Sequence, residues 1–130
     1  MGIIFTEEIP KAQSLYELYD ELDWNNFLKL SPEQLERATE QSFMSLSAYD
    51  GDRLVGTGRI VSDGVINAYL CGLGVSPEYE GRGIGSNIVK YLALQCEERK
   101  LHLQLFCNDE LTAYYEKLGF KQFVNGMKFY

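Results

Sequence analysis

Hydrophobic positions in the first third of the chain follow the spacing of helices. Between residues 10 and 23 apolar side chains recur every three or four positions, which predicts a helix that starts at Pro10 and ends near Asp23. Its apolar positions are Leu15, Leu18, Tyr19 and Leu22. Ser31-Pro32-Glu33-Gln34 predicts the start of a second helix, because it combines a serine N-cap, a proline at the first helical position and a glutamine that can complete a capping box. We expect Leu35 and Ala38 on its inner face and a short strand over residues 2–6 before both helices.

The middle of the chain changes to an alternating pattern. Residues 43–49, 53–61 and 65–75 read as three strands. Asp50-Gly51-Asp52 and Ser62-Asp63-Gly64 are the turns between them. Because each turn joins consecutive strands, the pattern predicts an antiparallel meander.

The last third returns to helical spacing and then alternates again. One apolar face predicts a helix from residue 84 to about residue 99, formed by Ile84, Ile88, Val89, Leu92 and Cys96. Residues 101–107 alternate as a strand, and residues 109–118 read as a helix that Gly119 ends. Asn125-Gly126 is typical of a type I′ turn and predicts a hairpin of strands 120–124 and 127–130.

This order of elements predicts a mixed α/β fold built as α+β layers. We expect a twisted, mostly antiparallel sheet with helices on both faces. The 130 residues and 45% hydrophobic content suit a single domain over residues 1–130, without repeat or linker.

Composition narrows the classes of partner. The net charge of −7 disfavours nucleic acid and mildly favours cationic small molecules, with a plain solubility role as an equal alternative. No apolar run is long enough to span a bilayer, and residues 1–13 lack the pattern of a secretory signal. Cys71, Cys96 and Cys107 are an odd, widely spaced set, which argues against a disulfide framework or a zinc site and favours a reducing cytoplasm.

A glycine-rich stretch, EGRGIGS at residues 80–86, lies between a predicted strand and a predicted helix. The first turn of a helix has free N–H groups and partial positive charge, so it can bind phosphate wherever the backbone can be approached closely. We therefore expect a diphosphate cradle made of main chain, with a tight turn that binds nothing as the alternative. A dinucleotide fingerprint would need glycine where Ser86 stands, and the Gly-Lys-Ser/Thr of a P-loop is absent from the sequence.

Two motifs resemble those of the GCN5-related N-acetyltransferase (GNAT) superfamily. Residues 75–86, VSPEYEGRGIGS, resemble its Q/R-x-x-G-x-G/A signature with the preceding V-x-P step. Asn108 followed by Tyr115-Glu116-Lys117-Leu118-Gly119-Phe120 resembles its second signature. Within the superfamily, residues 103–120 and the early Leu18-Tyr19 and Trp24 are most similar to short bacterial and plastid enzymes of the arylalkylamine (serotonin) N-acetyltransferase-like group.

The resemblance implies acetyl-CoA as donor, no metal, and acetyl transfer to a primary amine of a small molecule by direct attack in a ternary complex. The implied cofactor-binding residues are Leu73, Gly74, Val75, Glu80, Gly81, Arg82, Gly83, Ile84, Gly85, Ser86, Asn108 and Tyr115. Tyr115 is the implied proton donor to the leaving thiolate, and the N–H of Val75 the implied partner of the acetyl carbonyl. For Asn108, a capping role at the end of the predicted strand is an equal alternative to a contact with the cofactor. Glu80 departs from the Gln or Arg of the signature, so we expect its side chain to face solvent.

Glycines in the predicted strand 65–75 indicate a bulge beside the next strand, which in the family is where the pantetheine arm fits. The general base stays open, because no carboxylate lies between Asp63 and Glu78. Ordered water, Tyr69 or an acid of the first two helices are the candidates. We expect His102 to be exposed and Cys71 and Cys107 to be buried as small apolar residues.

The acceptor pocket is expected between the N-terminal helices and the C-terminal hairpin. The N-terminal helices carry four aromatic residues that could line such a pocket: Tyr16, Tyr19, Trp24 and Phe27. The alternative is that these residues simply belong to the core-facing side of the helices. A homodimer through the C-terminal strands is also implied by the resemblance. Two further functions remain open, a non-catalytic acyl-CoA sensor and a peptide or protein N-acetyltransferase.

Overall fold

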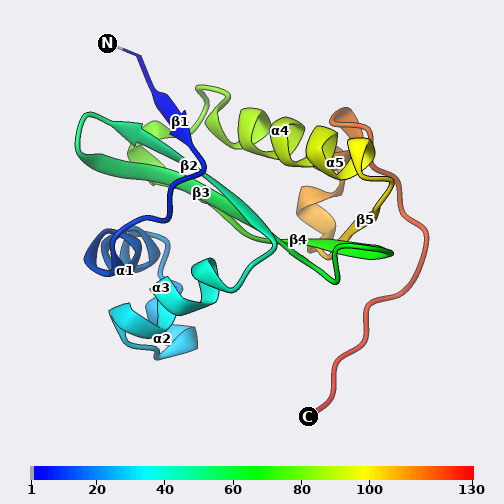
Figure 1. Ribbon diagram of the computed structural model, residues 1–130, viewed down its shortest axis with the longest axis horizontal. Helices are drawn as coiled ribbons and strands as arrows, with labels where there is room; N and C mark the ends of the chain where they lie inside the picture. Colours follow the sequence, from blue (N-terminus) through cyan, green and yellow to red (C-terminus); the bar gives the residue numbers. More distant parts are fainter. Residues whose placement is uncertain (1) are drawn as a thin grey trace.

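A five-stranded sheet forms the centre of the computed structural model, which describes residues 2–130 (Figure 1). Its strands, in sheet order, are β1 (Ile4–Thr6), β2 (Met44–Asp50), β3 (Arg53–Ser62), β4 (Asn67–Val75) and β5 (His102–Leu105). The first four strands are antiparallel neighbours, whereas β5 pairs with β4 in parallel. The meander predicted from the alternating pattern is therefore confirmed.

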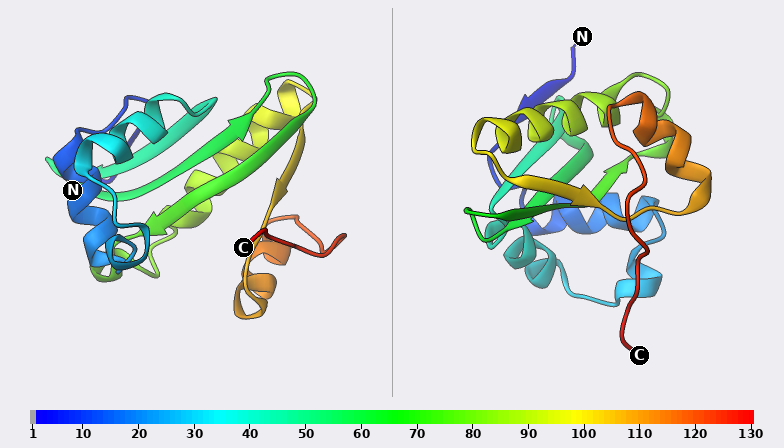
Figure 2. Two further views of the ribbon diagram at one scale, coloured as in Figure 1. Left: turned by 90° about the horizontal axis from the view of Figure 1, so that it is seen from below. Right: turned by 90° about the vertical axis from the view of Figure 1, so that its right-hand side faces the viewer.

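Helices cover both faces of this sheet (Figures 1 and 2). They are α1 (Ala12–Glu21), α2 (Asn25–Leu28), α3 (Pro32–Glu40), α4 (Ile84–Glu98) and α5 (Thr112–Lys117). Two 3₁₀ turns, Pro77–Tyr79 and Asp109–Leu111, precede α4 and α5. The mixed fold with a mostly antiparallel sheet is as predicted.

Each face of the sheet has its own apolar cluster. All five apolar residues predicted for the face of α4 are buried against the sheet, together with residues such as Val55 and Ile60. On the other face Leu15 and Leu18 of α1 pack with Leu35 of α3 and Leu54 of β3. Burial of these two apolar surfaces is the main favourable contribution to folding.

The local sequence predicted the start of one helix correctly and the start of another incorrectly. The Ser31 hydroxyl accepts from the Gln34 N–H at 3.2 Å, and the Gln34 side chain accepts from the Ser31 N–H at 2.8 Å, so the capping box is confirmed. The first helix begins at Ala12 rather than Pro10, because Lys11 is extended with ψ of 149°. Helix α2 was not predicted, since four residues are too few to show a period.

The predicted C-terminal hairpin is wrong. Residues 120–130 form no strand, and most large apolar side chains there are exposed, up to 99% for Phe129. An isolated two-stranded hairpin is only marginally stable without a third strand or a helix to cover it, so the Asn125-Gly126 turn signal does not suffice. The strand before it is also shorter than predicted, since β5 ends at Leu105 rather than at residue 107.

Candidate active site

Strand β4 separates from β5 halfway along its length. The parallel pairing runs from Asn67 opposite His102 to Leu70 opposite Leu105 and stops there, whereas β4 continues to Val75. Within residues 2–130, no strand pairs with this edge of β4 over residues 71–75. Its main-chain groups are therefore free to bind a ligand as an added strand would.

A β-bulge shapes the same part of β4. Thr57 lies opposite Gly74 and Arg59 opposite Cys71, so two residues of β4, Gly72 and Leu73, oppose one residue of β3. Gly72 has φ of 60°, a conformation that glycine adopts without the steric cost of a side chain. The predicted bulge is thus confirmed.

The unpaired edge of β4 presents particular N–H groups. The Ser76 N–H points toward β3, where it donates to the Val55 carbonyl at 2.8 Å. Because backbone groups alternate sides along a strand, the N–H of Val75 points the opposite way, toward the unpaired edge. The sequence resemblance implied this N–H as the partner of the acetyl carbonyl, and it implied Leu73, which lies in the bulge, as a second main-chain contact of the cofactor.

The first turn of α4 lies directly beyond this edge. Its N-cap, Gly83, has φ of 80° and no side-chain cap. Among residues 2–130, no protein acceptor bonds the N–H groups of residues 84–86. Gly81 has φ of 79°, and a Cβ at either glycine would meet no atom within 4 Å, so backbone conformation rather than packing requires glycine. The 15 residues of α4 therefore offer free amides at a positive helix end.

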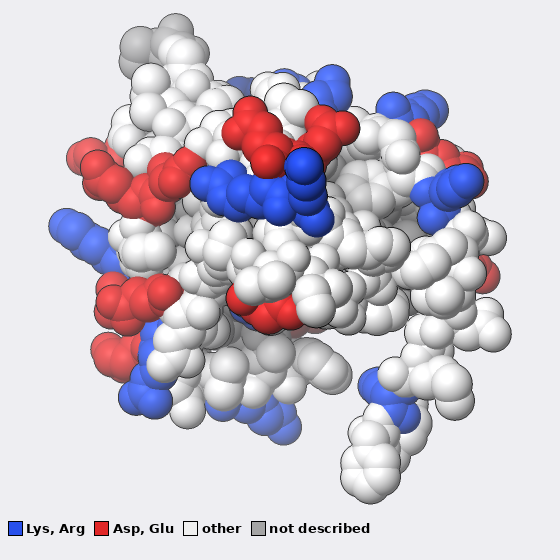
Figure 3. Space-filling model, turned by 45° about the vertical axis from the view of Figure 1, so that its right-hand side comes forward, with Lys and Arg blue, Asp and Glu red and all other residues white. Residues whose placement is uncertain are grey.

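Other residues of the loop have distinct surroundings. Glu80 is exposed, as expected for a carboxylate beside a phosphate site. The Arg82 guanidinium lies 4.7 Å from the centre of the Tyr79 ring, a cation–π contact, whereas Ile84 is buried in the core. Basic and acidic side chains are interspersed over the face of the molecule that Figure 3 shows.

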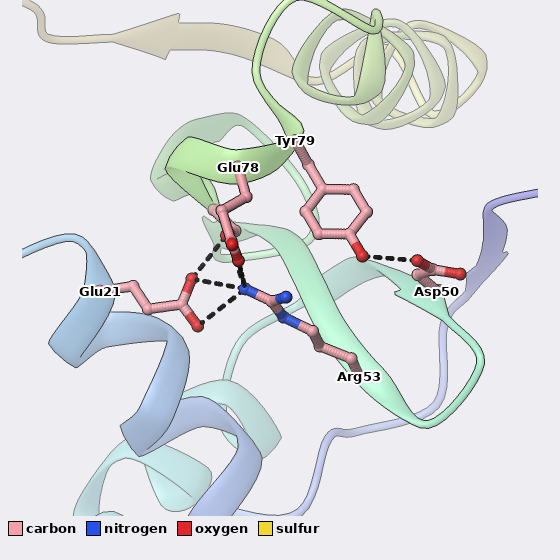
Figure 4. Close-up of polar contacts among 6 residues, drawn as sticks. Glu21, Asp50, Arg53, Glu78 and Tyr79 are labelled. Atoms are coloured by element: carbon pink, nitrogen blue, oxygen red, sulfur yellow. Dashed lines mark hydrogen bonds and ion pairs between the residues drawn. The ribbon is translucent and has the colours of Figure 1, made fainter.

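A polar network that the sequence analysis missed joins α1 to the start of the loop (Figure 4). Arg53 of β3 pairs with Glu78 at 2.5 Å and Glu21 at 3.4 Å, and the buried Ser76 hydroxyl donates to Glu21 at 2.5 Å. The hydrogen bond to Glu78 raises the pKa of Arg53. Since Glu21 is engaged in these contacts, it is not a free general base. Partners far apart in the sequence leave no periodic signal, which is why the network could not be predicted.

The same loop is fixed on its other side by Tyr79. Its hydroxyl donates to Asp50 at 2.5 Å, and this hydrogen bond is the main cause of its raised pKa. The ring lies between Arg82 and Arg53, whose guanidinium is 5.1 Å from the ring centre. The loop that leads to α4 is therefore held from both sides.

The two tyrosines of α5 face different surroundings. The Tyr114 hydroxyl lies 3.4 Å from the Ser86 hydroxyl and would be 3.0 Å from a Cβ on Gly85. Tyr115 packs edge-on against Phe120 at 5.9 Å between ring centres and lines a groove of about 970 Å³ between β5, α5 and the C-terminal segment. Burial raises the pKa of Tyr115 to about 12. Asn108 is exposed, and its carbonyl accepts from the Leu111 N–H at 2.9 Å, so it begins the 3₁₀ turn.

The opposite face of β4 is covered by the loop after α1. A Cβ on Gly74 would lie 2.5 Å from Leu22 and 2.8 Å from Trp24, so only glycine allows these side chains to reach the strand. Trp24 also packs edge-on against Tyr19 at 4.9 Å. Phe27, another predicted pocket residue, is 81% exposed. Of the predicted aromatic set, Trp24 and Tyr19 are the ones placed beside the bulge.

The remaining candidates divide between correct and wrong predictions. His102 is exposed, as expected. The prediction that Cys71 and Cys107 are buried is wrong, because β5 ends before Cys107 and Cys71 lies at the open edge of β4. Tyr69 stacks on Phe106 with ring centres 6.2 Å apart. Within residues 2–130, no three His, Cys, Asp or Glu side chains gather as metal ligands, and none of the helices has the length and hydrophobicity to cross a membrane.

Comparison with known proteins shows the family of this chain. The model of the acetyltransferase (GNAT) family matches residues 5–120. The chain belongs to the GNAT acetyltransferase family. It is therefore an acetyltransferase, and the family uses acetyl-CoA. The fold and family expected from the two motifs are confirmed.

Individual relatives extend over most of this GNAT chain. An uncharacterized N-acetyltransferase, ycf52, of Pyropia yezoensis is 27% identical over 91% of this chain and 71% of its own length. The GNAT protein SP0256 of Streptococcus pneumoniae has a similar structure, with a TM-score of 0.80, 27% identity and coverage of 99% and 98% of the two chains. An aminoglycoside 6′-N-acetyltransferase complexed with coenzyme A has a TM-score of 0.72 and 21% identity over 91% and 84% of the chains.

Proposed function

We propose that the protein transfers the acetyl group of acetyl-CoA to a primary amine of a small molecule, by direct attack within a ternary complex. The observation that carries this proposal is the unpaired edge of β4 that leads straight to the uncapped amides of α4. The strand edge suits the pantetheine arm, and the helix start suits the diphosphate. A fold neighbour is an aminoglycoside 6′-N-acetyltransferase complexed with coenzyme A, which supports coenzyme A as the kind of ligand.

The chemistry assigns a role to each group. The amine nitrogen attacks the thioester carbonyl, the carbon–nitrogen bond forms, and the carbon–sulfur bond breaks as the sulfur leaves with its electron pair. The N–H of Val75 holds the carbonyl oxygen as it becomes negative, because a fixed dipole costs no reorganisation during the reaction. The amides of residues 81–86 hold the diphosphate.

Tyr115 is the proposed hydrogen-bond and proton donor to the departing sulfur. Because burial raises the pKa of its phenol to about 12, it keeps its proton at neutral pH. Tyr114, whose hydroxyl lies beside Gly85 and Ser86, is instead placed to support the diphosphate end. The proton lost by the amine leaves through ordered water or Tyr69, since β4 has no carboxylate.

An experiment can use the single tryptophan of the sequence, Trp24, as a reporter. Because Trp24 packs on Gly74 at the open part of β4, its fluorescence should change when acetyl-CoA binds. Release of CoA thiol with a panel of small amines then tests turnover. We expect both a fluorescence change and amine-dependent thiol release.

A non-catalytic acyl-CoA sensor would require this chain to have lost the acetyl transfer of its family, and the one observation in its favour is the absence of a carboxylate on β4. Tight acetyl-CoA binding without thiol release on any small amine or peptide would establish it and overturn the first proposal. Thiol release on peptides alone would instead indicate a peptide N-acetyltransferase.

We also propose a homodimer and a cytoplasmic setting. Within residues 2–130, no strand pairs with the outer edge of β5, and the neighbouring Phe123 and Val124 are exposed by more than half. Such an edge beside apolar side chains is suited to pairing with a second copy. Light scattering that shows only monomers would contradict the dimer. The three free cysteines are the basis for the compartment.

A further inference from the structure

A row of polar side chains crosses three strands on the sheet face that α1 covers. Ser45 of β2 lies opposite Arg59 of β3, and Arg59 lies opposite Cys71 of β4. The row ends at the bulge, where Arg59 Nε and the hydroxyl of Tyr19 would each lie 3.3 Å from a Cβ on Gly72. The cation of Arg59 is therefore directly beside the part of β4 at which acetyl transfer is proposed.

Arg59 lacks an anionic partner. Within residues 2–130 both ion pairs are made by Arg53, and the polar partners of the Arg59 guanidinium are neutral hydroxyls, that of Ser42 at 3.3 Å and that of Tyr19. Arg59 is also partly buried. A partly buried cation without a counterion is unfavourable, because it has lost hydration without gaining an opposite charge.

The neighbouring Ser45 also carries a polar group without a partner. It is only 4% exposed, and its hydroxyl has no hydrogen-bond partner in the described part of the chain, residues 2–130. The next row on the same face is different, since the Ser47 and Thr57 hydroxyls bond each other at 3.0 Å. Buried hydroxyls are nearly always paired, so the hydroxyl of Ser45 next to an unpaired cation indicates a missing polar ligand.

We propose that Arg59, with Ser45 and Tyr19, binds an anionic group of the acceptor, so that the substrate is an amine that also carries a carboxylate or a phosphate. This inference rests on the proposed acetyl transfer. The guanidinium supplies the opposite charge and several N–H donors, and the two hydroxyls can donate as well. Cys71 and Val75 are four residues apart on β4, a separation on the order of 10 Å, so the amine and the anion must be several bonds apart.

Matched pairs of acceptors test this proposal. 6-Aminohexanoate against hexylamine tests a carboxylate, and glucosamine 6-phosphate against glucosamine tests a phosphate. Binding of each to the CoA complex is measured by calorimetry, which needs no turnover, and kcat/KM is measured by thiol release. We expect at least one anionic member to bind about tenfold more tightly or better than its neutral partner.

The variants Arg59→Gln and Arg37→Gln separate this site from general charge. Arg37 is exposed near the end of α3, so its loss removes the same charge elsewhere. Arg59→Gln should reduce the preference for the anionic acceptor roughly 10- to 100-fold through KM, whereas Arg37→Gln should leave it in place. Should Arg59→Gln fail to fold, Ser45→Ala should lower the preference several-fold.

The possible outcomes distinguish a failure of the proposed anion site from a failure of the proposed acetyl transfer on which it rests. Equal affinity for both members of both pairs, or an unchanged preference in Arg59→Gln, would overturn the anion site while acetyl transfer to neutral amines stands. Acetyl-CoA binding without turnover or binding of any amine would instead overturn the proposed function, and this proposal with it.

Discussion

The two faces of the sheet show how one small fold separates stability from chemistry. The face under α4 is apolar, with Val55, Ile60 and Ile88 fully buried. The face under α1 and α3 combines a smaller apolar cluster with rows of serine, threonine and arginine side chains. Strand β4 belongs to both faces, and its bulge and open edge lie where the polar rows end. A continuous apolar face thus holds the strand rigidly, while the other face is free to carry polar groups.

The largest effect on stability is expected on the α4 face. Ile88→Ala removes a fully buried side chain and should lower the free energy of unfolding by about 2–5 kcal/mol, because the close-packed cluster cannot fill the cavity. Leu94→Ala on the same helix, where the side chain is 56% exposed, should cost less than about 0.5 kcal/mol. Urea unfolding measures both. Similar losses for the two variants would contradict the contrast between the faces.

Tyr115→Phe should have the largest effect on catalysis. Removal of a proton donor typically lowers kcat about 100-fold or more, and acetyl-CoA affinity should change little. Tyr114→Phe is the matched control that removes one neighbouring hydroxyl, and it should lower kcat less than about tenfold. Steady-state kinetics and Trp24 fluorescence titration measure the two quantities. A larger kcat loss in Tyr114→Phe would transfer the donor role to that residue.

The hydrogen bond between the buried hydroxyls of Ser47 and Thr57 can be tested by removing first one hydroxyl and then both. Thr57→Val leaves the buried Ser47 hydroxyl without its partner and should lower the free energy of unfolding by about 1–3 kcal/mol. Adding Ser47→Ala removes the unpaired hydroxyl and should restore part of that loss. If the two changes are instead additive, the hydroxyls are not coupled as the structure indicates.

The smallest effect expected is a dependence of stability on alkaline pH. The pKa of Tyr115 is about 12 in the folded chain, above its ordinary value of 10.0. The phenol is neutral in both states below pH 10, so its contribution is complete there and is lost as pH rises from 10 to 12. Other tyrosines with raised pKa, such as Tyr19, also contribute, so the difference between wild type and Tyr115→Phe isolates this group. An identical slope in both proteins would show that Tyr115 does not titrate as described.

Periodic patterns made the helices and the meander predictable, because burial on one face repeats along the sequence. The glycines of the loop were also informative, since Gly81 and Gly83 adopt positive φ that other residues avoid. The contacts of Arg59 and Arg53 were not predictable, because their partners come from distant segments and leave no local pattern. The prediction of a C-terminal hairpin failed for a related reason. The Asn125-Gly126 turn signal is local, whereas a strand also needs a neighbouring strand or helix to stabilise it.

The most direct test of the account is whether the N–H groups of residues 81–86 bind the diphosphate of CoA. Backbone amide NMR of the labelled protein, titrated with CoA and with pantetheine, which lacks the diphosphate, measures this directly. The account predicts that CoA shifts these amide signals most, and that pantetheine shifts those of Leu73 and Val75 while it leaves residues 81–86 nearly unchanged. Saturable CoA binding with the signals of residues 81–86 unmoved would contradict it.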